Sequence, residues 1–171
     1  VTSSKNFTEG HKLRHEIYDY FSGIDEINQL EIYQHKSPPH HERRNDFFES
    51  SKFHVAVENC KEVNYFSEKI VDCFVSKTIP IYYGCPNIGD FFNTKGMFVF
   101  NNLEGLKTIL LNLTPEDYEN MLPFIEENYE LAKKYYGENC ITKRLPKKVS
   151  SCVTTIIPVS YTHLTLPTIL L

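Results

Sequence analysis

The chain has 171 residues, and 41% of them are hydrophobic, which is enough to form the core of one globular domain. Its formal net charge of -4 argues against nucleic acid as the main partner. The five cysteines show no C-x-x-C spacing, which argues against a zinc site or a disulfide scaffold.

The first predicted element is an amphipathic helix over residues 9–21, in which apolar residues recur at helical spacing. Thr8 is suited to cap its first turn, and Gly23 ends it. A short strand over 30–33 follows. A polar loop interrupted by two prolines then leads to a helical turn at 45–50.

The middle of the chain alternates apolar runs with helical patterns. The apolar runs predict strands over 53–58, 79–83 and 97–100. The nearly continuous run at 79–83 is typical of a parallel strand that is buried on both faces. The segments between and after these strands predict helices over 67–75 and 103–113.

A strong helix start lies at Thr114. This residue can cap the helix, Pro115 suits its first position, and Asp117 can return a hydrogen bond as a capping box. The helical pattern continues to Tyr136, and Pro123 is expected to kink or split it. The alternation of strands and helices predicts an α/β fold, a Rossmann-like parallel sheet flanked by helices.

The turn between strand 53–58 and the next helix is the main candidate site. Tyr65 lies in this turn, and Glu68 and Lys69 open the helix. Ligands of open α/β sheets bind beyond the carboxyl ends of strands, where a helix N-terminus also favours anions. A carboxylate beside an ammonium there suits sugar hydroxyls next to a phosphate, although an ordinary exposed helix start carries the same residue types. Adjacent helical side chains point about 100° apart, so these two are not expected to pair with each other.

The first helix offers further candidates. Arg14 lies on its polar side, where an exposed arginine is the simpler interpretation and a contact with a diphosphate is the functional one. His11 and His15 have the i, i+4 spacing of metal ligands, but without an H-E-x-x-H pattern or a third ligand nearby we predict no metal site.

Several nucleotide-binding motifs are absent from the sequence. It contains no G-x-G-x-x-G and no P-loop, which argues against NAD enzymes and NTPases. It also contains no D-x-D, the motif with which many nucleotide-sugar transferases hold a metal beside the leaving diphosphate. Positive charge would then come from Arg14, Lys69 and the helix N-terminus.

Three segments carry a family pattern: FHVAVEN at 53–59, YFSEKI at 65–70 and IPIYYG at 79–84. They resemble the C-terminal half of the α1,3-fucosyltransferases, whose pattern is close to F-x-x-x-x-E-N, Y-V-T-E-K-I and V/I-P-I/V-Y-x-G. Phe66 and Ser67 replace the commoner Val and Thr. The resemblance spans residues 1–136 and implies the C-terminal, donor-binding half of a GT-B glycosyltransferase.

The resemblance also implies roles for residues around the turn. Glu68 would bind the ribose hydroxyls of GDP-fucose, Lys69 would meet the diphosphate, and Tyr65 would line the nucleotide pocket. Glu58 and Asn59 would shape the floor of that pocket.

Arg14 matches the diphosphate-binding arginine of the family. The family's catalytic carboxylate base belongs to an N-terminal domain, so no residue of this chain is assigned as the base and no catalytic residue is predicted. We therefore expect the chain to be inactive on its own.

The resemblance implies a fragment of an enzyme that transfers fucose from GDP-fucose to a glycan acceptor with inversion. Donor binding would need no metal and no cofactor, and the partners would be the nucleotide-sugar donor and the glycan. Two alternatives remain: a GT-B transferase with another nucleotide sugar, and a non-catalytic nucleotide-binding module.

The predicted donor-binding domain covers residues 1–145, with sequence missing before it, and residues 146–158 form a tail of undefined structure. Residues 159–171 resemble one reading frame of a transposon-end adapter used in DNA library preparation. We interpret them as an artefact and expect few long-range contacts from them. No signal peptide or membrane span is visible, and the sequence assigns neither a compartment nor a membrane association.

Overall fold

The computed structural model describes residues 5–22, 30–31, 51–135 and 169–170. Their strands form one sheet of order β1-β5-β2-β3-β4, in which every neighbouring pair is parallel. The strands are β1 (Leu30–Glu31), β2 (Phe53–Val57), β3 (Ile79–Tyr83), β4 (Phe98–Val99) and β5 (Ile169–Leu170). The predicted parallel α/β sheet is therefore confirmed.

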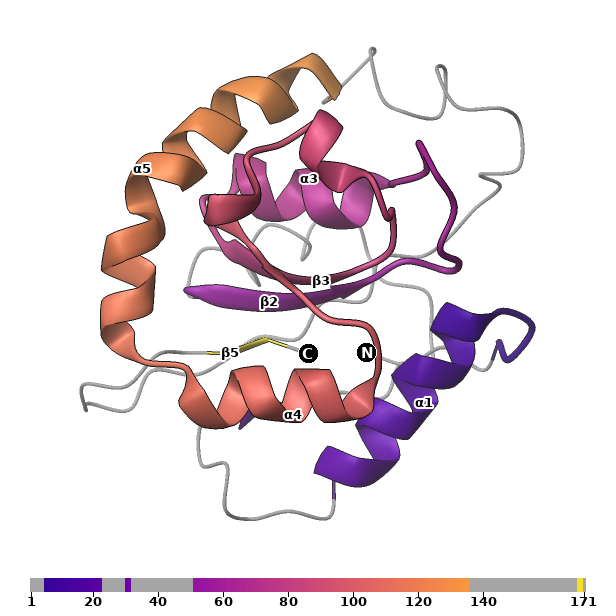
Figure 1. The fold of residues 1–171 in the computed structure, drawn as a ribbon. Coiled ribbons are helices and arrows are strands. Elements are labelled where there is room, and N and C mark those ends of the chain that lie inside the picture. Colours follow the sequence, from indigo (N-terminus) through magenta and orange to yellow (C-terminus); the bar gives the residue numbers. More distant parts are fainter. Residues whose placement is uncertain (1–4, 23–29, 32–50, 136–168, 171) are drawn as a thin grey trace, which may run out of the picture.

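Helices cover both faces of this sheet (Figure 1). On one face lie α1 (Glu9–Phe21) and α4 (Leu103–Asn112), and on the other lie α3 (Glu68–Val75) and α5 (Pro115–Ala132). Single 3-10 turns lie at η2 (Ile88–Asp90), η3 (Thr94–Gly96) and η4 (Lys133–Tyr135). The ammonium of Lys107 lies 3.6 Å from the ring centroid of Tyr20, which joins α4 to α1.

The two central strands explain the apolar runs of the sequence. Every residue of β2 and β3 is buried, because helices cover both sides of the sheet. The register pairs Phe53 with Ile79 and Val57 with Tyr83. The two strands therefore end side by side, and the loops that follow them begin at the same edge of the sheet.

The predicted caps at Thr8 and Thr114 are confirmed, and Ser67, predicted as the first residue of a helix, is the cap of α3. The hydroxyl of Thr8 accepts a hydrogen bond from the backbone N–H of His11, and the hydroxyl of Ser67 accepts one from the backbone N–H of Lys69. Thr114 and Asp117 form the reciprocal capping box at the start of α5. Helices α1 and α5 therefore start at the residues that the sequence indicates, and α3 starts one residue later.

Helix α5 is not split at Pro123. It runs unbroken through this residue and curves around α3 (Figure 1). Pro123 is exposed, so the missing backbone hydrogen bond falls on the solvent side, where curved helices already lengthen such bonds. None of the described helices is long and apolar enough to cross a membrane.

The expectation of few long-range contacts in 159–171 is wrong for Ile169–Leu170. This dipeptide forms β5, which pairs with Phe53 and His54 of β2 and with β1. The edge of β2 offers backbone donors and acceptors that a β-prone apolar dipeptide can pair with. Residues 45–50 and 146–158 lie outside the described residues, and the adapter origin of 159–171 stays a prediction.

Candidate functional site

The turn between β2 and α3 is held on two sides. The N–H of Asn64 donates to Oδ1 of Asn87 at 2.8 Å, and Nδ2 of Asn87 donates back to Oδ1 of Asn64 at 2.8 Å. This amide pair joins the loops that follow β2 and β3. Asn64 has a φ of 62°, a left-handed conformation that asparagine tolerates well. Next to it, the ring of Phe66 lies 5.4 Å from Phe92 and 5.3 Å from Tyr135 between centroids.

Glu58 ties the end of β2 to the start of α3. Its carboxylate is fully buried and accepts from the backbone N–H of Ser67 at 2.8 Å and from the Ser67 hydroxyl at 2.7 Å. Gly84, after β3, leaves the room for it, since a Cβ there would lie 2.5 Å from Cγ of Glu58. The negative charge therefore sits where the α3 dipole is positive.

Lys69 completes this buried cluster. Its ammonium lies 2.9 Å from the Ser67 hydroxyl and 3.4 Å from Oε2 of Glu58, and its side chain is only 3% exposed. It also lies 3.6 Å from Oε1 of Glu68, a side chain that is 22% exposed. The expectation that Glu68 and Lys69 do not pair is wrong, because a long lysine side chain folds back toward the helix N-terminus. Glu68 is the more accessible of the two carboxylates that meet Lys69.

Arg14 is buried rather than exposed, in contrast to the simpler interpretation of the sequence. Its guanidinium donates to the carbonyl oxygen of Val57 at 2.6 Å and to Oδ1 of Asn59 at 2.9 Å. Both partners belong to the carboxyl end of β2. A guanidinium offers several donors in one plane, and these two bonds fix Arg14 at this edge of the sheet.

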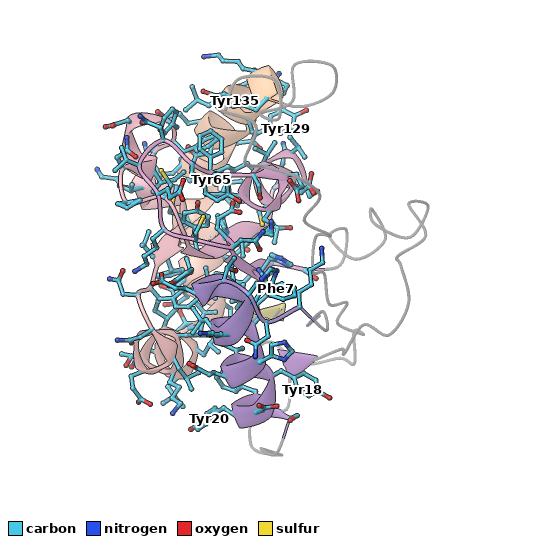
Figure 2. All side chains as sticks on the ribbon, turned by 90° about the vertical axis from the view of Figure 1, so that its right-hand side faces the viewer. Phe7, Tyr18, Tyr20, Tyr65, Tyr129 and Tyr135 are labelled. Atoms are coloured by element: carbon cyan, nitrogen blue, oxygen red, sulfur yellow. The ribbon has the colours of Figure 1, made fainter. Side chains whose placement is uncertain are left out.

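Helix α1 approaches this edge with its first turn. The N–H of Gly10 donates to the carbonyl of Asn59 at 2.9 Å, and a Cβ on Gly10 would lie 1.7 Å from the carbonyl oxygen of Glu58. Only glycine permits this distance. Figure 2 shows Phe7 at the near end of α1 and Tyr18 and Tyr20 toward its far end, away from Tyr65.

His11, in the same first turn, is 5% exposed. Its Nδ1 lies 2.8 Å from the hydroxyl of Thr8. Burial lowers the pKa of His11 to about 4, and nearby cationic groups add to this shift. In decreasing order of effect these groups are Arg14, Lys5, Lys69 and His15. His15 instead bonds the carbonyl of Lys5 at 3.1 Å, and no group of three or more metal-binding side chains occurs among the described residues.

The carboxyl end of β2 thus brings together most of the predicted site residues. Arg14 contacts Asn59. Lys69 contacts both Glu58 and Glu68. The sixth predicted residue, Tyr65, is buried in the turn, and its backbone adjoins the Cys85 thiol.

Two residues at this edge were not predicted as site residues. Ser67 is both the cap of α3 and a partner of Glu58, and the charges of Arg14 and Lys69 act on His11. Their sequence signals were present, as a serine before a helix and as an i, i+4 histidine pair. Neither signal indicates a place in the site, because that place depends on contacts between segments that are distant in the sequence.

Comparisons with known proteins identify the family of the chain. The family model described as glycosyltransferase family 10 (fucosyltransferase) C-term matches residues 3–137. Alpha-(1,3)-fucosyltransferase FucT of Helicobacter pylori is 25% identical over 138 residues, which are 78% of this chain and 29% of that protein. The chain therefore spans less than a third of the length of this relative.

Solved structures of α1,3-fucosyltransferases are also similar. One with GDP-fucose is 26% identical with a TM-score of 0.46, and the match covers 67% of this chain and 36% of the other. One with GDP is 21% identical with a TM-score of 0.47, and the match covers 75% and 44%. Scores this low add nothing to the family match.

Proposed function

Since the chain belongs to glycosyltransferase family 10, the fucosyltransferases, and matches the C-terminal region of these proteins, we propose that it binds GDP-fucose for transfer to a glycan acceptor. The observation that carries the proposal is the cluster at the carboxyl end of β2. There, buried Arg14 donates to Asn59 and buried Lys69 pairs with Glu58. This is the edge at which open α/β sheets bind ligands.

The donor would lie across the start of α3. Glu68 accepts hydrogen bonds from the ribose hydroxyls, and Tyr65 lines the nucleotide pocket. Glu58 and Asn59 form its floor, where they hold Lys69 and Arg14 respectively. The partial exposure of Glu68 suits a carboxylate that gives up one contact with Lys69 to meet the ribose.

Two cations would face the diphosphate. Arg14 and Lys69 come from helices on opposite faces of the sheet, but both side chains reach the end of β2. Negative charge grows on the diphosphate as the sugar leaves, and fixed positive groups stabilise that charge without reorganising. These groups would take the place of a metal, and the full reaction would invert the anomeric carbon with a carboxylate base from outside this chain.

The test is a transfer assay with the intact enzyme, a glycan acceptor and GDP-fucose, with UDP-galactose and GDP-mannose as comparators. We expect turnover with GDP-fucose and with neither comparator, and little change in turnover with excess chelator. NMR should show that the anomeric configuration of the product is inverted relative to that of the donor. Turnover with a comparator and not with GDP-fucose would show that the comparator is the donor substrate. Binding of GDP without any transfer would favour a non-catalytic module, and loss of activity with chelator would refute the metal-independent site.

A further inference from the structure

The imidazole of His11 has one nitrogen that the described protein residues leave unused. The ring is the third residue of α1, and its Nδ1 lies 2.8 Å from the hydroxyl of Thr8. The same hydroxyl accepts the backbone N–H of His11 at 3.3 Å. At the other side of the ring, Nε2 is buried and has no hydrogen-bond partner among the described residues.

A buried nitrogen without a partner is destabilising, and such atoms often mark a ligand position. The contact with Thr8 is compatible with a ring that carries its proton on Nε2. In that tautomer the Thr8 hydroxyl accepts from the backbone N–H of His11 and donates its own hydrogen to Nδ1. The neutral ring can then donate a hydrogen bond from Nε2.

The surroundings of His11 select an anion as the partner. Arg14 lies one turn further along α1, and its charge disfavours a positive charge on the ring. Lys5, Lys69 at the start of α3 and, most weakly, His15 add to this electrostatic effect. Burial is the largest cause of the lowered pKa of His11, and the cations Arg14, Lys5 and Lys69 that add to it would also attract a phosphate.

We propose that Nε2 of His11 is a further ligand of the donor diphosphate and donates to a phosphate oxygen beside Arg14 and Lys69. This inference rests on the proposed function. It adds to the site a neutral donor that the sequence-based assignment did not contain.

The experiment compares His11→Leu with wild type in the intact protein, with pyrophosphate, GDP and guanosine as separate probes. We expect about tenfold to a hundredfold weaker binding of pyrophosphate and of GDP, because one hydrogen bond to a charged group is lost. Guanosine, followed by ligand-observed NMR, should bind as in wild type. His11→Gln, which restores an N–H donor, should recover part of the loss.

Asp19→Asn is the matched control, because it changes an exposed polar side chain near the other end of the same helix. It should leave all three affinities unchanged. Wild-type pyrophosphate affinity in His11→Leu would overturn the inference and leave the proposed function intact. An equal loss of guanosine binding would show a structural role instead, whereas a wild-type protein that binds neither GDP nor pyrophosphate would overturn the proposed function itself.

Discussion

At the scale of single residues, the buried Glu58–Lys69 pair serves the fold as well as the site. Both side chains are almost fully inaccessible, and Ser67 satisfies part of each. Such a pair adds little net stability compared with apolar residues, but either charge is costly when left alone. A loss of activity after substitution of Lys69 therefore needs a stability measurement beside it.

We predict that Lys69→Met lowers the free energy of unfolding by about 3–5 kcal/mol, because it leaves the Glu58 carboxylate buried without its counter-ion. The double variant Glu58→Gln/Lys69→Met should lose clearly less than the sum of the two single variants. Urea unfolding of the four proteins completes the cycle. Additive losses would show that the two charges do not interact.

His54, the second residue of β2, makes the stability of the protein depend on pH. Burial lowers its pKa to about 3, whereas the unfolded chain has the ordinary value of 6.5. Below pH 6.5 the unfolded chain binds a proton that the folded chain excludes, so stability falls as the pH drops toward 3. The slope attributable to this residue is about 1.4 kcal/mol per pH unit.

We expect His54→Gln to remove most of this contribution. The measurement is urea unfolding of the variant and of wild type at pH 7, 6 and 5. If the two proteins lose stability in parallel over this range, the neutral buried state of His54 is refuted.

At the scale of elements, the position of α1 depends on one glycine. A Cβ on Gly10 would overlap the carbonyl oxygen of Glu58, so Gly10→Ala must push α1 away from the end of β2. That movement would disturb the two bonds of Arg14. We expect a loss of several kcal/mol in stability, on the scale of backbone strain and overpacking, together with weaker GDP binding.

Gly105→Ala is the control for this prediction. Gly105 lies in α4, where an added Cβ would be 3.5 Å from the nearest atom. Alanine in a helix is favoured over glycine by roughly 0.5–1 kcal/mol, so this variant should be slightly more stable than wild type. Thermal unfolding of both variants tests the pair, and equal effects would contradict the close packing of α1 on β2.

The elements were largely predictable because their signals are local. Apolar runs mark β2 and β3, and Thr8, Ser67 and Thr114 cap helices through bonds within one turn. The burial of Arg14 was not predictable, since its partner Val57 lies 43 positions away in the sequence. The Glu68–Lys69 contact and the unbroken α5 likewise depend on how whole elements pack.

At the scale of the whole molecule, two helices on opposite faces begin at one strand end. α1 carries Arg14 and His11 to the end of β2, and α3 brings Glu68 and Lys69 to the same edge. The sequence suggests this edge through the strand-turn-helix pattern and the family motifs. The pairing of β5 with β2, by contrast, joins two segments that lie far apart in the sequence, which no local pattern indicates.

The proposed binding of the donor nucleotide at this edge of the sheet can be measured by calorimetric titration of GDP into the intact protein with excess chelator. We predict that wild type binds GDP under these conditions and that Glu68→Ala weakens binding by about one to two decades, since a charge-assisted hydrogen bond to the ribose is lost. Glu116→Ala, which removes a carboxylate from the first turn of α5 instead, should bind as wild type does. Absence of GDP binding in wild type, or unchanged affinity in Glu68→Ala, would contradict the account.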